Sequence, residues 1–376
     1  MRMLVFPYGR DCEPIVRHAG LLEPCYEIAA LVSPGGWGMA GKDITVVDSG
    51  AILPVYEKIQ EVTEEFDSLF IPPFEVFGKE VENRLVDEML RLIPCISHVI
   101  YASRLAGENH KKLEEACLLA GEACSFIDFS EYKEPKVFSL AEPIEEYPSL
   151  IPLDVPVAVV AGWWERTDKF EVSLALREQF LKRGYHVSQV GSRDGCEMFG
   201  FHSFPSFMFR KDVDAVAKII YFNRWIVEVA RKERPDLLLI TIPGAIQNFN
   251  EQFTRGFGMM HHQVFQAVAP DILVMCTFYM SVSKKILEDM SRFCEYRFGV
   301  PVDAFHMSNL YIDVNESEVQ NRIITKSIYR ENVSEAIAKE AAASIPVFNG
   351  LDIGECTRVA ELILEKLDPE EFWEVV

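Results

Sequence analysis

The chain has 376 residues, enough for two domains that each bury a core of their own. Hydrophobic residues make up 49% and charged residues 25%, with no long polar tract, which excludes extended disorder. The formal net charge of −21 argues against nucleic acid and anionic membranes as partners, and no stretch approaches the ~20 apolar residues of a membrane span. We therefore expect a globular, cytoplasmic protein with an acidic surface.

The nine cysteines are an odd number and include no CxxC pair. This irregular spacing is typical of reduced thiols in a cytoplasmic protein, and it predicts neither a metal site nor an iron–sulfur site. The apolar run at the start is short and is followed by Gly9, Arg10 and Asp11. It therefore indicates a first strand and not a signal peptide.

The first 131 residues alternate between strand and helix patterns. The expected strands span 3–6, 27–32, 67–73, 98–103 and 124–128, and the expected helices span 15–21, 80–92 and 108–120. This alternation predicts an open, doubly wound, Rossmann-like α/β domain over residues 1–131. The glycines between 35 and 41 lack the GxGxxG spacing at the start of a helix, so a flexible loop is favoured there over a dinucleotide site.

A segment rich in Pro and Glu follows, and we place a linker at 132–154 and the second domain at 155–376. Short apolar runs separated by helical stretches predict a parallel sheet in this domain, with strands at 157–161, 186–190, 237–241, 272–276 and 302–306. We expect a P-loop-NTPase-like domain with a degenerate Walker A loop. Ligands of such sheets bind at the carboxyl ends of the strands.

The loop between the strand at 157–161 and an expected helix at 171–183 is the main candidate site. A phosphate loop places backbone N–H groups and a Lys around an anion at a helix N-terminus. The residues that we expect to bind such a ligand here are Gly162, Arg166, Thr167 and Lys169.

This loop departs from the standard pattern at two neighbouring positions. Asp168 stands where a glycine normally precedes the Lys, and Phe170 stands where a Ser or Thr normally binds Mg²⁺. Asp168 also offers an alternative that the sequence leaves open, since its carboxylate can cap the helix and close the site.

A second metal-binding position is lost at the strand 237–241. A phosphate-loop enzyme normally carries Asp or Glu at its end, whereas this strand ends at Thr241. The two losses together predict that a phosphate-bearing ligand, such as a nucleotide or an acyl-CoA, binds without Mg²⁺, and we expect no metal site. The tandem pair His261 and His262 is also favoured as structural, because adjacent helical side chains diverge by about 100°.

The loop after the strand 186–190 carries a dense set of polar side chains among Gly and Phe. Arg193, Glu197 and His202 are the candidates for catalytic roles near a transferred group. Cys196 lies beside Gly195 in the same loop and is the thiol most open to a functional role.

Several of these segments resemble a known family. The segments are Glu165–Phe170, Leu174–Arg177, Gly184–Arg193, Cys196–Pro205 and Arg297–Gly299. They resemble the peptide maturation system proteins that are encoded beside Cys-rich-peptide radical SAM maturases in natural-product cassettes. More distantly, residues 235–246 and 269–276 are similar to proteins with a Rossmann-like front half and a phosphate-loop back half, which include D-amino-acid N-acetyltransferase-like proteins.

The resemblance implies an accessory role in the maturation of a ribosomally synthesised, modified peptide. The implied partners are the precursor peptide, the radical SAM maturase, or both. An alternative from another class remains, namely an enzyme that transfers a group from a nucleotide or acyl-CoA to a peptide or amino acid. Whether the chain is an enzyme stays open at this point.

Overall fold

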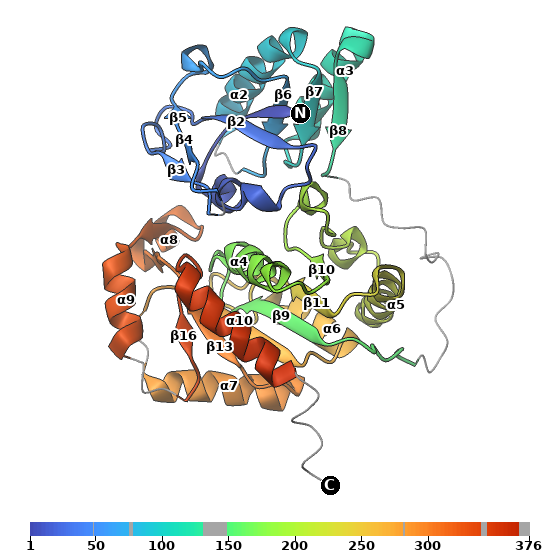
Figure 1. The fold of residues 1–376 in the computed structure, drawn as a ribbon, viewed down its shortest axis with the longest axis vertical. Coiled ribbons are helices and arrows are strands. Elements are labelled where there is room, and N and C mark those ends of the chain that lie inside the picture. Colours follow the sequence, from blue (N-terminus) through green and yellow to red (C-terminus); the bar gives the residue numbers. More distant parts are fainter. Residues whose placement is uncertain (48, 75–77, 131–148, 281–282, 340–343, 368–376) are drawn as a thin grey trace. The chain divides into compact units, whose positions relative to one another are not determined.

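The computed structural model describes residues 1–47, 49–74, 78–130, 149–280, 283–339 and 344–367. The chain divides into two compact units, each with its own six-stranded sheet (Figure 1). Unit 1 comprises Met1–Lys133 and Arg193–Ser203, and unit 2 comprises Glu134–Ser192 and Phe204–Val376. Residues 132–148 of the linker expected at 132–154 lie outside the described residues. The predicted fold class, two α/β units with parallel sheets, is confirmed.

The sheet of unit 1 runs in the order β5-β2-β1-β6-β7-β8, with every neighbouring pair parallel. Its strands are β1 (Arg2–Val5), β2 (Glu27–Val32), β5 (Val55–Tyr56), β6 (Ser68–Ile71), β7 (His98–Tyr101) and β8 (Ser125–Asp128). Because β1 lies inside the sheet and the later strands extend from it in both directions, the unit is Rossmann-like. Met3, Leu4 and Val5 are fully buried, as a strand covered on both faces requires.

Two helices supply apolar side chains to the core of unit 1, α2 (Lys79–Leu92) and α3 (Gly107–Ala120). Leu85 and Leu113 from these helices join the strand residues of one cluster. The unit also contains α1 (Glu13–Arg17) and an antiparallel pair, β3 (Ile44–Thr45) with β4 (Ile52–Leu53).

The sheet of unit 2 runs in the order β10-β11-β9-β12-β13-β16, again parallel throughout. Its strands are β9 (Val157–Gly162), β10 (Val187–Val190), β11 (Leu237–Thr241), β12 (Ile272–Thr277), β13 (Ala304–Met307) and β16 (Val347–Phe348). The strand beside β9 is β11, although β10 comes next in the chain. The carboxyl ends of β11 and β12 therefore flank the loop that follows β9.

Helices α4 (Lys169–Lys182) and α10 (Ile353–Leu367) share one apolar core with this sheet, and Figure 1 shows them in front of its strands. The helices α5 (Ala215–Glu233), α6 (Met259–Ala267) and α7 (Lys284–Phe298) pack in series, α5 against α6 and α6 against α7. The remaining elements are α8 (Val314–Gln320), α9 (Arg330–Lys339) and the antiparallel pair of β14 (Leu310–Ile312) and β15 (Thr325–Ser327).

Short 3-10 turns complete both units. They are η1 (Arg10–Cys12), η2 (Ala19–Leu21), η3 (Ile59–Glu61), η4 (Ile93–Cys95), η5 (Gly121–Ala123), η6 (Cys196–Phe199), η7 (Ser206–Phe209) and η8 (Arg255–Gly258).

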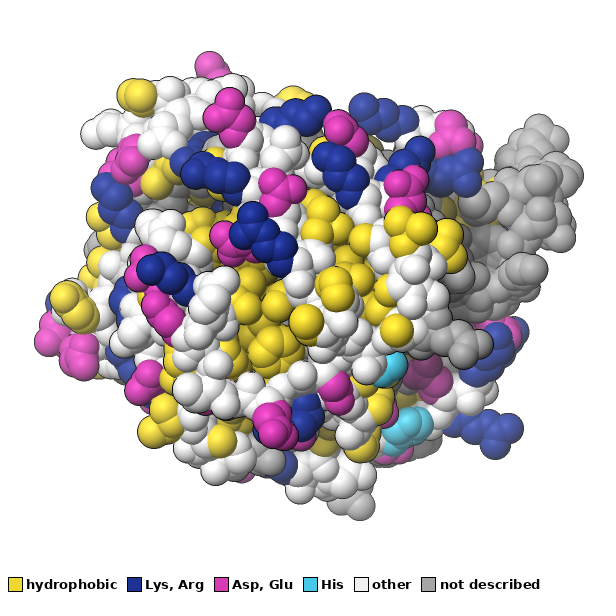
Figure 2. All heavy atoms as spheres, turned by 90° about the horizontal axis from the view of Figure 1, so that it is seen from above, with side chains coloured by type: hydrophobic (Ala, Val, Ile, Leu, Met, Phe, Trp, Pro, Cys, Tyr) yellow, Lys and Arg dark blue, Asp and Glu magenta, His cyan; other side chains and the backbone are white. Residues whose placement is uncertain are grey.

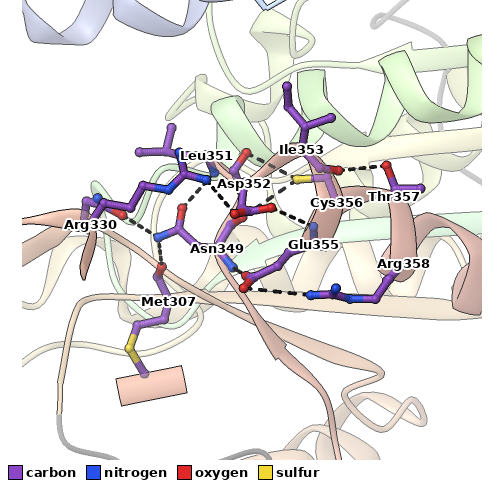
Figure 3. A network of polar contacts seen from close by, with 12 residues as sticks. Met307, Arg330, Asn349, Leu351, Asp352, Ile353, Glu355, Cys356, Thr357 and Arg358 are labelled. Atoms are coloured by element: carbon purple, nitrogen blue, oxygen red, sulfur yellow. Dashed lines mark hydrogen bonds and ion pairs between the residues drawn. The ribbon is translucent and has the colours of Figure 1, made fainter. Parts of the chain in front are cut away.

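A polar network fixes the turn between β16 and α10 (Figure 3). The Asn349 side chain donates to the Met307 carbonyl at 3.0 Å, which ties the turn to the carboxyl end of β13. The Asp352 carboxylate accepts from the Glu355 N–H at 3.0 Å and pairs with Arg330 at 2.5 Å. This network holds the start of α10 at the same edge of the sheet as the loop after β9.

The surface is mixed in character. On the face drawn in Figure 2, hydrophobic side chains form a central area that is bordered by Lys, Arg, Asp and Glu. Across the described parts of the chain, no helix has both the length and the apolar character needed to cross a membrane.

Candidate functional site

The loop between β9 and α4 turns into the helix through left-handed residues, although it lacks the expected glycine. Asp168 has φ 56° and ψ 24°, and Arg166 has φ 57°. L-residues seldom occupy this region, but the short polar side chain of Asp makes it one of the more tolerant residues. Asp168 therefore adopts the left-handed conformation for which a phosphate loop normally uses glycine.

The Asp168 carboxylate does not cap α4 through its side chain. It instead accepts a hydrogen bond from the hydroxyl of Ser308, which follows β13. The alternative in which Asp168 closes the helix end by capping it therefore does not occur in this structure.

Lys169 is the first residue of α4 and its side chain reaches back over the loop. A Cβ added at Gly162 would lie 2.7 Å from the Lys169 Nζ, 2.4 Å from the Trp164 carbonyl oxygen and 2.9 Å from the Thr167 Oγ1. Only glycine fits at position 162, because the nearest of these atoms belongs to the backbone. Gly162, Thr167 and Lys169 thus lie close together, whereas the Arg166 side chain is exposed.

Thr167 is fully buried and its hydroxyl donates to the Trp164 carbonyl at 3.1 Å. This hydrogen bond stabilises the turn of the loop itself. Thr167 therefore shapes the loop from within.

Two tryptophans of the loop pack against aromatic side chains of unit 2. The Trp163 and Trp164 rings stack with centroids 5.0 Å apart. Trp164 also stacks on Phe278 at 6.0 Å and meets Phe249 edge-on at 5.4 Å. Both indole rings are thereby held beside the loop, and each buries its Nε1 without a hydrogen-bond acceptor among the described residues.

The two positions that normally bind Mg²⁺ carry other groups. Phe170 is 3% exposed and presents an apolar ring. Thr241, at the end of β11, is fully buried, and its hydroxyl makes no hydrogen bond with any residue that the structure describes. Within the same described ranges, no group of three or more His, Cys, Asp or Glu side chains is placed to hold a metal ion.

His261 lies near this loop, and the sequence favoured a structural role for it. It is fully buried near the start of α6, and neither ring nitrogen has a partner among the described residues. Burial, and to a lesser degree the positive charge of Lys169, lower the pKa of His261 to about 3. The imidazole is therefore neutral at physiological pH. A buried structural histidine is expected to have hydrogen-bond partners, so the lack of partners among the described residues makes His261 unusual.

The backbone explains how α6 comes close to the loop. The Ile246 N–H donates to the Gly162 carbonyl at 2.8 Å, which joins the segment after β11 to the end of β9. Further along, the positive φ of Gly258 (73°) places it against the Ile246 carbonyl, just before α6 begins. The only signal for His261 in the sequence is a histidine pair soon after a strand end.

The three predicted catalytic residues lie in unit 1, in the segment Arg193–Ser203, whereas Lys169 lies in unit 2. The Glu197 carboxylate accepts from the Ser203 N–H at 2.8 Å and from its hydroxyl at 2.7 Å. Arg193 donates to the Asp11 carbonyl, and His202 is partly buried. These contacts of Arg193 and Glu197 fix the shape and position of the segment.

Cys196 lies in the same segment and is buried. Burial raises the pKa of its thiol far above the usual range, and its Sγ donates to the Arg193 carbonyl at 3.1 Å. A thiol of this kind is a poor nucleophile, because the thiolate is the reactive form.

No protein-family model matches this sequence, and no curated protein matches it either. Among solved structures, the chain is similar to a DUF1611 family protein from Anabaena variabilis, with 13% identity, a TM-score of 0.58, and coverage of 97% of this chain and 99% of that one. An apo GTPase from Pyrococcus abyssi also matches, with 13% identity, a TM-score of 0.32, and coverage of 56% of this chain and 97% of that one. A nucleotide-binding protein in complex with ADP from Archaeoglobus fulgidus matches with 13% identity, a TM-score of 0.32, and coverage of 58% of this chain and 90% of that one. At 13% identity, the similarity to the DUF1611 family protein concerns the fold alone, two α/β units with parallel sheets.

Proposed function

We propose that this protein is a cytoplasmic accessory factor in the maturation of a ribosomally synthesised natural-product peptide. In this role unit 2 binds its partner, the precursor peptide or the radical SAM maturase, through a phosphate-loop scaffold that no longer hydrolyses nucleotides. The observation that carries the proposal is the pair of positions Phe170 and Thr241. A buried phenyl ring and a buried hydroxyl replace the hydroxyl and carboxylate that hold Mg²⁺ in hydrolysing relatives of the fold.

Charge supports a peptide partner. A net charge of −21 attracts a Lys-rich leader peptide and repels polyphosphate backbones. Such attraction is screened by salt, so peptide binding is expected to weaken as ionic strength rises. Binding that stays unchanged between low and high salt would remove this part of the proposal.

The remaining parts of the loop still suit an anion. Lys169 contributes a full positive charge at the start of α4, and the side chain of Asp168 leaves the helix end uncapped. An anionic group of a ligand can therefore bind here with no metal, with a preference on the order of 1 to 3 kcal/mol.

A thermal-shift screen with the precursor peptide, ATP, GTP and CoA tests the function, because a ligand that binds only the folded state raises its melting temperature. We expect the peptide to raise it, and we expect any shift with ATP to be the same with and without Mg²⁺. Lys169→Met is expected to lose the shift with ATP. Magnesium-dependent ATP hydrolysis that disappears in Lys169→Met would contradict the proposal.

A second candidate is transfer of a group from a nucleotide or acyl-CoA to a peptide or amino acid. One observation favours it: His261 is buried, neutral and close enough to Lys169 for its charge to act on the ring. The imidazole at this place can form a hydrogen bond with a transferred group. A shift with CoA, together with an acylated peptide detected by mass spectrometry, would favour this candidate over the accessory role.

A further inference from the structure

The carboxyl edge of the sheet in unit 2 contains buried polar atoms that the described residues leave without hydrogen bonds. They are the two ring nitrogens of His261, the Oγ1 of Thr241 and the Nε1 atoms of Trp163 and Trp164. Each unsatisfied group of this kind costs on the order of 1 to 3 kcal/mol. So many at one sheet edge indicate that something else supplies their partners.

Most of these buried atoms are hydrogen-bond donors. An indole N–H can only donate. A neutral imidazole donates from one nitrogen, and the hydroxyl of Thr241 can donate as well. A group with several acceptor oxygens and a negative charge can satisfy several donors at once and suits the nearby Lys169.

Backbone hydrogen bonds join the loop after β9 to β12 and to the segment that leads to α6. On one side, the Trp163 N–H donates to the Cys276 carbonyl at 2.8 Å, at the end of β12. On the other side, Ile246 bonds to Gly162 and leads to Gly258 and α6, which carries His261. The Nζ of Lys169 lies close to Gly162, and its positive charge acts on the ring of His261.

We propose that His261 and Lys169 form an oxyanion subsite at the loop after β9, in which Lys169 supplies the charge and the imidazole of His261 donates a hydrogen bond. The ligand group is a phosphate or a carboxylate, as found on a phosphate-bearing ligand or at a peptide C-terminus. This inference rests on the proposed binding function and adds to it a residue and a ligand class.

A neutral imidazole gives the subsite a particular pH dependence. The positive charge of Lys169 and the burial of His261 both disfavour the imidazolium form. Sulfate keeps its double negative charge across pH 5 to 8, so it is a suitable probe. Its affinity is expected to stay constant to within about twofold over this range.

The experiment is calorimetric titration of the full-length protein with sodium sulfate and, separately, sodium acetate. Lys169→Met is expected to abolish sulfate binding. His261→Phe, which keeps a ring of similar size, is expected to weaken it about tenfold, and the neighbouring His262→Phe is expected to leave it unchanged. If sulfate binds much more tightly than acetate, the ligand group is a phosphate, and the reverse order indicates a carboxylate.

The outcomes separate this inference from the proposed function. If Lys169→Met loses sulfate while His261→Phe retains it, the anion site stands and the role of His261 is wrong. If neither variant changes anion binding, or neither sulfate nor acetate binds, the oxyanion subsite is wrong, whereas the proposed function is decided separately by binding of the precursor peptide. Affinity that rises steeply below pH 6.5 would show a charged imidazole and overturn the neutral-donor arrangement.

Folding of His261→Phe is checked through its melting temperature. The imidazole signals of His261 in a ¹⁵N NMR spectrum of the wild type give an independent readout. We expect them to stay in the neutral form and to shift on addition of sulfate. Signals that do not move at saturating sulfate would contradict the contact.

Discussion

Arg104 holds Asp194 across ninety positions of sequence, with its Nε at 2.6 Å and its Nη2 at 3.0 Å from the two carboxylate oxygens. The contact fastens the segment Arg193–Ser203 to the rest of unit 1. The carboxylate of Asp194 is largely buried, but the guanidinium is 65% exposed, so solvent screens the pair. We expect Arg104→Ala and Asp194→Ala each to lower the free energy of unfolding by about 0.5 to 1.5 kcal/mol.

A double-mutant cycle in urea isolates the pairing energy. The exposed pair of Arg210 and Asp212 is the control, because both side chains lie in solvent only two positions apart. A coupling for Arg104 and Asp194 no larger than that of the control pair would show that other contacts hold the segment.

Replacing Asp168 by glycine is expected to strengthen anion binding. The change removes a negative charge next to Lys169, and glycine adopts the φ of 56° without strain. We expect sulfate to bind about three to ten times more tightly by calorimetry. The control is Ser308→Ala, which breaks the same hydrogen bond but keeps the charge. Equal gains in both variants would show that the hydrogen bond, and not the charge, limits binding.

The stability of the protein should depend on pH through His261. Its pKa falls from 6.5 to about 3 on folding, so between these values the unfolded state binds a proton that the folded state does not. The free energy of unfolding therefore decreases as pH falls below 6.5, by about 2 kcal/mol at pH 5 from this residue alone. Above pH 6.5 the imidazole is neutral in both states and contributes no slope.

His261→Phe removes the contribution of His261 to the pH dependence of the free energy of unfolding. We expect the variant to lose less stability than the wild type between pH 7.5 and pH 5, as measured by chemical denaturation at both values. His306, whose pKa burial also lowers to about 3, remains in both proteins and cancels in the comparison. Parallel losses in the two proteins would mean that His261 is not buried in its neutral form.

The segment before α6 offers a matched pair of glycines. Gly256 and Gly258 both have φ 73°, but a Cβ at Gly258 would lie 2.0 Å from the Ile246 carbonyl oxygen, whereas one at Gly256 would meet nothing within 4 Å. Gly256→Ala is expected to cost about 1 to 2 kcal/mol from the backbone conformation alone. Gly258→Ala should cost at least about 2 kcal/mol more and also weaken sulfate binding, because the backbone near Gly162 must shift. Equal losses of stability would argue against the close contact.

The fold could be read from the sequence where burial is continuous along a strand. The strands expected at 27–32 and 237–241 coincide with β2 and β11, because fully buried parallel strands are uninterrupted apolar runs. The two-residue strands β5 and β16 are too short to show any periodicity. Helix α4 begins at Lys169, two residues before the expected 171, because Asp168 turns the chain in the left-handed region.

The site could be predicted only where its residues are close in sequence. Gly162, Thr167 and Lys169 belong to one strand, loop and helix, whose order predicts their meeting. His261 reaches the loop through the segment after β11, whose path depends on the contact of Gly258 with Ile246. Nothing near Asp194 in sequence indicates that its partner is Arg104. Local patterns carry no information about such distant contacts.

Arg193–Ser203 belongs to unit 1, although the residues just before it belong to unit 2, and this order affects biosynthesis. The ribosome completes residues 134–192, which belong to unit 2, before it makes the last segment of unit 1. At 5–20 residues per second this interval lasts about 3 to 12 seconds. During it, Arg104 and Asp11 have no partner from that segment. A nascent chain or a fragment that ends before residue 193 therefore carries unit 1 in an unfinished form, and no single cut in the chain can release the two units intact.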